Sequence, residues 1–217
     1  RLVSRGLGDV YKRQPLNFDK SFEGHRDYLI LELLYTTGIR RQELIDLKIQ
    51  NIDYSNKRIK VLGKRNKERY IPLISSTIES IDKYLKYRDE LKNIKSNDKL
   101  FLTSKGKSIY DNLVYRITKK YFAGFSTKSK KSPHILRHSF ATHLLNNGAD
   151  LNSVKDLLGH TSLAATQVYT NRSIEEIKKV FKKTHPRNKG WHKFVFWLKK
   201  NIICFVWKNK YLHLQSA

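Results

Sequence analysis

The C-terminal half of the chain contains the run PHILRHSFATHLL at residues 133–145, which is followed by LLGH at residues 157–160 and by Tyr169. Ser132 can cap a helix whose first residue is Pro133, because proline has no N–H group to leave unsatisfied there and its φ is already helical. The run therefore predicts a helix that begins at Pro133.

Apolar and polar side chains fall on different faces of this predicted helix. Leu136, Phe140 and Leu144 recur at a helical spacing and can be buried together. His134 and Arg137 are three residues apart and share another face, beside the helix N-terminus, where free N–H groups and the helix dipole favour an anion. This polar pair is expected to face outward, toward a ligand such as a phosphate.

Glycines divide the segment that follows. The first helix is expected to stop near Gly148 and a second helix at Gly159, because glycine readily adopts the left-handed backbone that ends a helix. His160 then lies in a turn. A third short helix, from Leu163 to about Tyr169, would place the Tyr169 hydroxyl at its far end, within reach of solvent or a ligand.

Helical patterns outnumber strand patterns in the rest of the chain. Apolar residues from Arg26 to Tyr35 predict a buried helix closed by Gly38, and Arg40 opens the next helix. Residues 58–62 and 69–73 alternate around a basic turn, which predicts an antiparallel hairpin. Further predicted elements are helices at about 78–91 and 111–122 and a short strand at 100–102. The fold class is therefore expected to be mainly α with a small antiparallel β-sheet (α+β).

The chain is strongly basic, with 44 Lys and Arg against 19 Asp and Glu and a net charge of +25. Residues 1–14 contribute +3 of this charge and residues 188–217 contribute +6, so residues 15–187 keep +16. A globular protein this basic is expected to bind a polyanion, nucleic acid before an anionic membrane. The single cysteine excludes an intramolecular disulfide framework and suits a reducing compartment such as the cytoplasm. No run of about 18 apolar residues predicts a membrane-spanning helix.

The runs at residues 133–145 and 157–160, together with Tyr169, resemble the C-terminal catalytic motif of Xer-type tyrosine recombinases, which are enzymes of the phage integrase family. The resemblance extends upstream to TGIRRQEL at residues 37–44 and GKRNKER at residues 63–69. Enzymes of this family cut and rejoin DNA through a tyrosyl phosphodiester. The resemblance implies their catalytic-domain fold and a function in site-specific recombination, as in chromosome-dimer resolution or mobile-element integration.

The resemblance assigns six residues to one catalytic site: Arg40, Lys64, His134, Arg137, His160 and Tyr169. Tyr169 would attack the scissile phosphate and form a 3′-phosphotyrosyl bond. Arg40 and Arg137 would bind the non-bridging oxygens, since a planar guanidinium suits phosphate better than an ammonium does. Glu43 matches a family acid that orients the site.

Proton transfer and a further phosphate contact fall to the other residues. By the resemblance, His134 would assist removal of the phenol proton, and His160 would hydrogen-bond a phosphate oxygen. Lys64 would protonate the 5′ leaving oxygen, with Lys67 as the alternative. Because the phosphotyrosine stores the bond energy, the resemblance implies neither a nucleotide cofactor nor a metal ion.

The same resemblance sets expectations for partners and domains. The partners are expected to be double-stranded DNA and further recombinase subunits, in a homo- or hetero-tetramer on paired recombination sites, with no membrane. Residues 15–187 are expected to form the catalytic domain, and the N-terminal DNA-binding domain of relatives is expected to be missing. Residues 1–14 resemble translated sequencing-adapter sequence. The basic aromatic residues 188–217 are interpreted either as an interfacial helix or as sequence read past a lost stop codon.

Other functions are less well supported by the sequence. A basic helical DNA-binding module without strand cleavage would explain the charge, but not six motif positions in order. A relaxing enzyme like the type IB topoisomerases shares the chemistry but not the Xer-like spacing. His134 and His138 have a helical spacing, yet no His-Glu-x-x-His pattern or cysteine pair completes a zinc site. No Gly-x-Ser-x-Gly elbow indicates a serine hydrolase.

Overall fold

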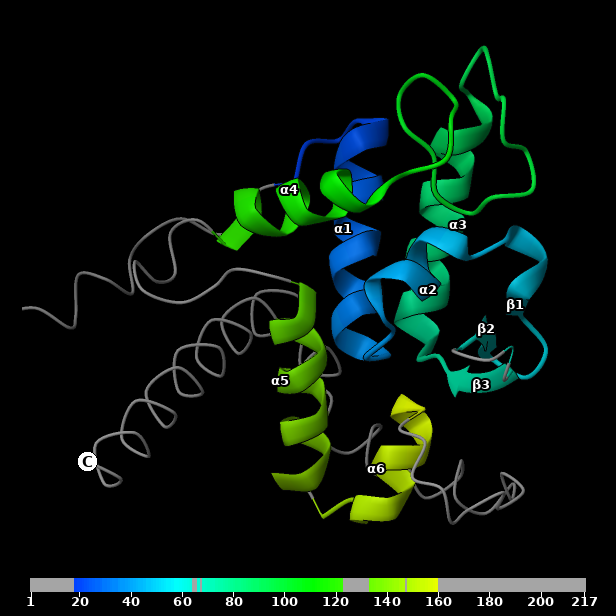
Figure 1. The fold of residues 1–217 in the computed structure, drawn as a ribbon. Coiled ribbons are helices and arrows are strands. Elements are labelled where there is room, and N and C mark those ends of the chain that lie inside the picture. The colour runs from blue at the N-terminus through cyan, green and yellow to red at the C-terminus, as the bar shows by residue number, and fades with distance from the viewer. Residues whose placement is uncertain (1–17, 64–65, 67, 123–132, 147, 160–217) are drawn as a thin grey trace, which may run out of the picture.

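The computed structural model describes residues 18–63, 66, 68–122, 133–146 and 148–159 (Figure 1). The helices among these residues are α1 Phe22–Thr36, α2 Arg41–Asp46, the 3₁₀-helix η2 Ile49–Asn51, α3 Ser75–Asp89, α4 Asp111–Phe122, α5 Pro133–Asn146 and α6 Leu151–Leu158. The strands are β1 Ile52–Asp53, β2 Arg58–Leu62 and β3 Glu68–Pro72. The predicted fold class, mainly α with a small antiparallel sheet, is confirmed.

Helix α1 is the centre of the fold. Every residue from Leu29 to Thr36 is buried, and Figure 1 shows the other helices arranged around α1. It packs most extensively against α3 and α5 and also contacts α2 and α4. A helix enclosed on all sides needs partners for its polar groups, and Thr77 of α3 donates a 2.9 Å hydrogen bond from Oγ1 to Oε1 of Glu32 on α1. No helix within the described residues is both long and apolar enough to cross a membrane.

The sheet is a meander of strand order β1-β2-β3, antiparallel throughout. Ile59 pairs with Ile71 across β2 and β3, and both side chains are buried in the core. The hairpin was predicted from the alternating pattern, whereas the two-residue strand β1 was not. It is too short to show an alternating pattern in the sequence.

The strand predicted at residues 100–102 is wrong. Leu100, Phe101 and Leu102 are all fully buried, and the segment makes only an isolated bridge, from Leu102 to Ser108. Its backbone donors go elsewhere: the Leu100 N–H binds the Leu47 carbonyl at 2.9 Å, and the Leu102 N–H binds the Tyr84 hydroxyl at 3.1 Å. The apolar run therefore reflects burial in a loop and not pairing in a sheet.

The glycine stops in the C-terminal part are confirmed. Helix α5 ends at Asn146 just before Gly148, and α6 ends at Leu158 with Gly159 in the left-handed conformation, at φ 65°. At the start of α6, the Asp150 carboxylate accepts a 2.8 Å hydrogen bond from the Ser153 N–H. The expected cap at Ser132 and the helix expected from Leu163 to Tyr169 lie outside the described residues.

Gly38 sets how closely the turn between α1 and α2 approaches α5 and α6. Its φ is 60°, and a Cβ on it would lie 2.5 Å from Cδ1 of Phe140 and 2.7 Å from Cδ2 of Leu158. Real carbon atoms do not approach so closely, so only glycine fits this position without a shift of the core. The turn therefore packs directly against α5 and α6.

Replacing Gly38 with alanine should destabilise the fold strongly. The methyl group would overlap Phe140 and Leu158, and the residue would also have to hold a positive φ, so the free energy of unfolding should fall by about 2–4 kcal/mol. Urea unfolding followed by circular dichroism measures this loss.

The matched control for this substitution is Gly148→Ala. Gly148 also has a positive φ, of 84°, but no described atom lies within 4 Å of the position of its Cβ. Gly148→Ala should therefore lower the free energy of unfolding only by the cost of a positive φ in alanine, about 1 kcal/mol. Equal losses in the two variants would contradict the steric explanation.

Candidate active site

Arg40 and Glu43 fix the start of α2. Arg40 is the N-cap residue, with φ −70° and ψ 150°. The Glu43 carboxylate, three residues later, accepts the Arg40 backbone N–H at Oε2 and the Arg40 Nη1 at Oε1, both at 2.8 Å. The helix start therefore holds the Arg40 guanidinium in a defined orientation.

Arg69 on β3 binds the same carboxylate from the other side. Its Nη1 and Nη2 donate to Oε1 and Oε2 of Glu43 at 2.8 Å and 2.7 Å, and both side chains are 5% exposed. Paired parallel bonds of this kind are the strongest geometry between arginine and a carboxylate. Glu43 is thus shared between an arginine on a helix start and an arginine on a strand.

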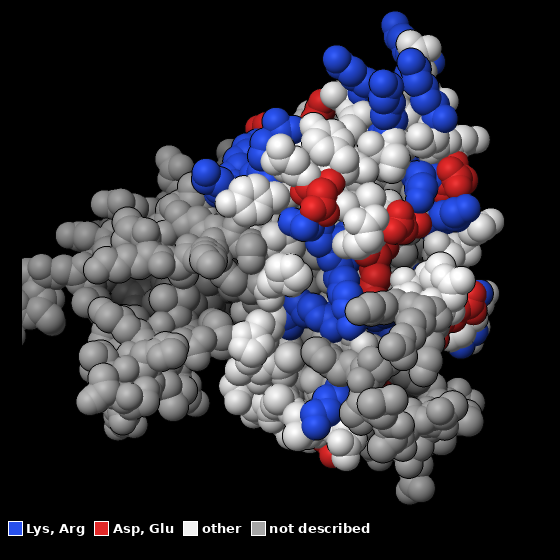
Figure 2. Space-filling view, viewed as in Figure 1, with Lys and Arg blue, Asp and Glu red and all other residues white. Residues whose placement is uncertain are grey.

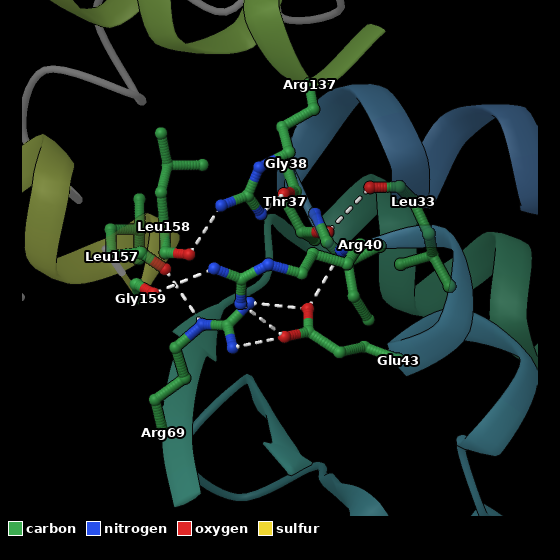
Figure 3. Close-up of polar contacts among 11 residues, drawn as sticks. Leu33, Thr37, Gly38, Arg40, Glu43, Arg69, Arg137, Leu157, Leu158 and Gly159 are labelled. Carbon is green, nitrogen blue, oxygen red and sulfur yellow. Dashed lines mark hydrogen bonds and ion pairs between the residues drawn. The ribbon is translucent and has the colours of Figure 1, made fainter. Parts of the chain in front are cut away.

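Arg137 reaches this group from α5. Its Nη1 donates to the Gly38 carbonyl and its Nη2 donates to the Leu158 carbonyl. Arg40 Nη2 donates to the next carbonyl, that of Gly159, at 2.8 Å. Figure 3 shows the three guanidiniums converging beside Glu43 and the end of α6. We call Arg40, Arg69, Arg137 and Glu43 the arginine cluster.

Three consecutive carbonyls at the end of α6 each accept from a different arginine. The Leu157 carbonyl accepts from Arg69 Nε at 2.9 Å, the Leu158 carbonyl from Arg137 and the Gly159 carbonyl from Arg40. The last carbonyls of a helix have no partner within the helix and carry the negative end of its dipole. The arginine cluster satisfies these acceptors, and they in turn fix the guanidiniums.

The cluster keeps an excess of positive charge, since three guanidiniums face one carboxylate. Burial on its own would raise the pKa of the Glu43 carboxyl, but the hydrogen bonds and charge of Arg69, followed by the hydrogen bonds of Arg40, lower that pKa to about 2. Burial, followed by repulsion from Arg40 and Arg69, lowers the pKa of the Arg137 guanidinium to about 10. The Glu43 carboxylate is therefore ionised and the Arg137 guanidinium protonated at neutral pH, and the arrangement favours an anionic ligand.

The structure brings together two of the six predicted site residues, Arg40 and Arg137, which bind adjacent carbonyls. His134 lies one turn before Arg137 on α5 and is exposed. The other three, Lys64, His160 and Tyr169, lie outside the described residues, as does the alternative acid Lys67.

One detail of the sequence prediction is wrong. Arg137 was expected to face outward with His134, but it is only partly exposed and turns toward Gly38 and Leu158. A half-buried guanidinium needs hydrogen-bond acceptors, and the two carbonyls supply them.

Arg69 was part of the quoted motif but received no role from the sequence. A signal was present, because Arg69 precedes Ile71 and Leu73 at a spacing of two and so points to the same side of the strand as these buried residues. An arginine at an inward position needs buried hydrogen-bond acceptors, and Glu43, next to the buried Leu44, is one that the sequence offers. Within the described ranges, no group of three or more His, Cys, Asp or Glu side chains could hold a metal ion.

Residues 13–176 match the Phage integrase family. Among curated proteins, the chain is 46% identical over 183 residues to the tyrosine recombinase XerC of Pelotomaculum thermopropionicum, covering 82% of this chain and 58% of that protein. It is 42% identical over 172 residues to XerC of Chlorobaculum parvum, covering 77% of this chain and 51% of that protein. The chain thus spans about half the length of the curated relatives it matches.

Two solved structures extend the comparison. The crystal structure of XerA recombinase is matched with a TM-score of 0.57 and 30% identity, over 75% of this chain and 59% of that one. The structure of XerH site-specific recombinase bound to its difH substrate, a pre-cleavage complex, is matched with a TM-score of 0.60 and 25% identity, over 83% of this chain and 48% of that one.

Replacing Glu43 with glutamine should destabilise the protein and make its free energy of unfolding depend less on pH in the acid range. Removing one partner from a buried ion pair costs about 3–5 kcal/mol, because Arg40 and Arg69 would face each other without a counter-charge. In the wild type, the Glu43 pKa is lower in the folded than in the unfolded chain, so its stabilising contribution is complete above about pH 4.5 and is lost as the pH falls toward 2.

Urea unfolding between pH 2 and 7 measures both effects. The fall in wild-type stability over this interval should be reduced in Glu43→Gln by about 3 kcal/mol. Glu79→Gln, on an exposed position of α3, is the control and should follow the wild-type profile. Parallel profiles for the wild type and Glu43→Gln would show that the carboxylate is not the group that titrates.

Proposed function

The chain belongs to the phage integrase family, and we propose that it provides the catalytic domain of a tyrosine site-specific recombinase, with residues 15–187 as that domain. Such an enzyme cleaves and rejoins DNA strands through a 3′-phosphotyrosyl intermediate. Support comes from the similarity to XerC proteins and from the geometry of the arginine cluster.

The observation that carries the proposal is the placement of Arg40 and Arg137 on adjacent carbonyls at the end of α6. Each guanidinium has five N–H donors, and the bonds described above use two on Arg40 and two on Arg137. Within the described part of the chain, donors therefore remain on both arginines for the non-bridging oxygens of a phosphate. Because the protein already fixes both side chains, little reorganisation is needed when charge develops on the phosphorane.

The reaction proceeds by two transesterifications. The Tyr169 oxygen forms a bond to phosphorus while the bond from phosphorus to the 5′ oxygen breaks; His134 accepts the phenol proton and Lys64 supplies a proton to the 5′ oxygen. His160 hydrogen-bonds a phosphate oxygen. In the second step, the oxygen of a 5′ hydroxyl on another strand bonds to phosphorus and its proton returns to Lys64, while the bond from phosphorus to the Tyr169 oxygen breaks and the phenolate regains its proton from His134. The phosphodiester energy is conserved, so the reaction requires no nucleotide cofactor.

The partner we propose is double-stranded DNA. Figure 2 shows Lys and Arg side chains gathered at the centre of the face seen in Figure 1, with others over α4, where Arg116, Lys119 and Lys120 are exposed. The XerH relative was solved on its DNA substrate. We further propose a homo- or hetero-tetramer on paired recombination sites, acting in the cytoplasm, where the DNA is.

A strand-cleavage assay tests the proposed nucleophile. Nicked suicide duplexes with randomised half-sites lose a short fragment after cleavage, so the enzyme stays attached to DNA. The chain should form a covalent adduct that survives denaturing electrophoresis and is unchanged by a chelator. The assay is run on the chain itself and on a fusion to the part of the Pelotomaculum relative that the match does not cover.

Tyr169→Phe should abolish the adduct, because the ring remains but the attacking oxygen is gone. Tyr115→Phe, which removes a hydroxyl from an exposed tyrosine on α4, should leave the adduct unchanged. DNA binding by both variants should weaken with salt at a log-log slope of about −0.9 per phosphate contact. An adduct in Tyr169→Phe would reject this nucleophile, and salt-sensitive binding without any adduct in either wild-type form would favour a DNA-binding module that does not cleave.

A further inference from the structure

The Arg69 side chain makes three hydrogen bonds, to Glu43 and to the end of α6. Its guanidinium donates twice to Glu43, at 2.8 Å and 2.7 Å, and once to the Leu157 carbonyl, at 2.9 Å. The side chain is 5% exposed, so it lies behind the surface that a DNA strand could contact. Arg69 therefore acts on other residues of the protein.

One of these residues is Arg40. The oxygen of Glu43 that accepts Arg40 Nη1, Oε1, also accepts Arg69 Nη1, and Oε2 accepts both the Arg40 backbone N–H and Arg69 Nη2. Each oxygen of the carboxylate is thus held between the two arginines. The orientation of the Arg40 guanidinium depends on a carboxylate that Arg69 keeps in place.

The other consequence concerns the end of α6. Arg69 binds the first of the three carbonyls whose other two bind Arg137 and Arg40. These carbonyls belong to consecutive residues, so a shift of the Leu157 peptide moves the acceptors of both other arginines. Arg69 thereby fixes the position of the end of α6 relative to Arg40 and Arg137. The last of the three residues, Gly159, directly precedes His160 in the chain.

We propose that Arg69 is a positioning residue for strand cleavage, which through Glu43 and the Leu157 carbonyl sets the geometry in which Arg40 and Arg137 receive the scissile phosphate. This inference rests on the proposed recombinase function and assigns a role to a residue outside the six that the motif supplied. The buried ion pair also stabilises the fold, so the test must separate positioning from stability.

The first variant is Arg69→Lys, which keeps the charge but cannot reach both Glu43 oxygens and the Leu157 carbonyl with one ammonium. Its single-turnover cleavage rate at saturating suicide DNA should fall about 10- to 100-fold, since a misplacement of about 1 Å has an effect of this size. Its DNA affinity should stay within about threefold of the wild type, because the basic surface is unchanged.

The matched control is Arg88→Lys. Arg88 is 2% exposed and binds the carbonyls of Asn97 and Lys99, at 2.8 Å and 3.1 Å, away from the cluster. Like Arg69→Lys, this variant disturbs a buried arginine that binds a carbonyl. It therefore reports the effect of lost stability alone on the cleavage rate. Its cleavage rate should equal the wild-type rate at a temperature where both are folded by circular dichroism.

The chemical readout is the cleavage rate on a substrate that carries a methylphosphonate at the scissile position. It replaces a charged non-bridging oxygen by a methyl group, so the reaction depends less on exact placement of the two guanidiniums. The rate ratio between the wild type and Arg69→Lys should shrink to within about threefold on this substrate, compared with the 10- to 100-fold ratio on the phosphodiester. A variant that is merely less folded would show the same ratio on both substrates.

A second variant covers the case in which Arg69→Lys does not fold. Glu43→Asp keeps the charge, shortens the carboxylate and leaves Arg69 in place, and it should show the same slow cleavage with recovery on methylphosphonate. The inference is overturned if every variant that folds cleaves at the wild-type rate, or if the loss is equal on both substrates. It is also overturned if only a 5′-bridging phosphorothiolate, which needs no acid for its leaving sulfur, restores the rate. Absence of an adduct in the wild type would instead reject the proposed function itself.

Discussion

A single buried carboxylate, that of Glu43, holds together a site composed otherwise of like charges. Arg40 and Arg69 both bind it, and burial, followed by repulsion from these two arginines, lowers the pKa of the Arg137 guanidinium. Charges removed from water are stable only when each has partners of good geometry. Glu43 supplies one unit of negative charge, and the carbonyls at the end of α6 supply the partial negative charge of a helix C-terminus. The cluster is thereby stabilised while a net positive charge remains.

The close approach of the backbone at Gly38 makes this arrangement possible. Without a Cβ at this position, Phe140 and Leu158 pack directly against the turn, and the Gly38 carbonyl comes within reach of Arg137. The turn therefore contributes to the core and to the site at the same point. A substitution here is expected to disturb stability and arginine placement together.

The guanidiniums proposed to bind the phosphate are held in place by the protein itself. The guanidiniums are fixed by backbone carbonyls, by Glu43 and by three elements, α2, β3 and α5, that pack on one core. Of the other proposed site residues, His134 lies on the same helix as Arg137, and His160 directly follows Gly159 in the chain. A rigid charged centre of this kind can stabilise a transition state without first rearranging.

The sequence by itself determined the local features of this protein. The spacing of Leu136, Phe140 and Leu144 predicted the buried face of α5, the glycines predicted where α5 and α6 stop, and the motif pointed to the family. Such features depend on residues within one or two helical turns, which periodicity and capping rules describe.

Only the tertiary structure decided how Arg137 turns inward, that residues 100–102 are a buried loop, and that Arg69 belongs to the site. Arg69 is 26 residues from Glu43 and 88 from Leu157. Whether they meet depends on how β3, α2 and α6 pack around α1. No local pattern records that packing, because every hydrogen bond of Arg69 joins a donor and an acceptor from elements that lie far apart in the sequence.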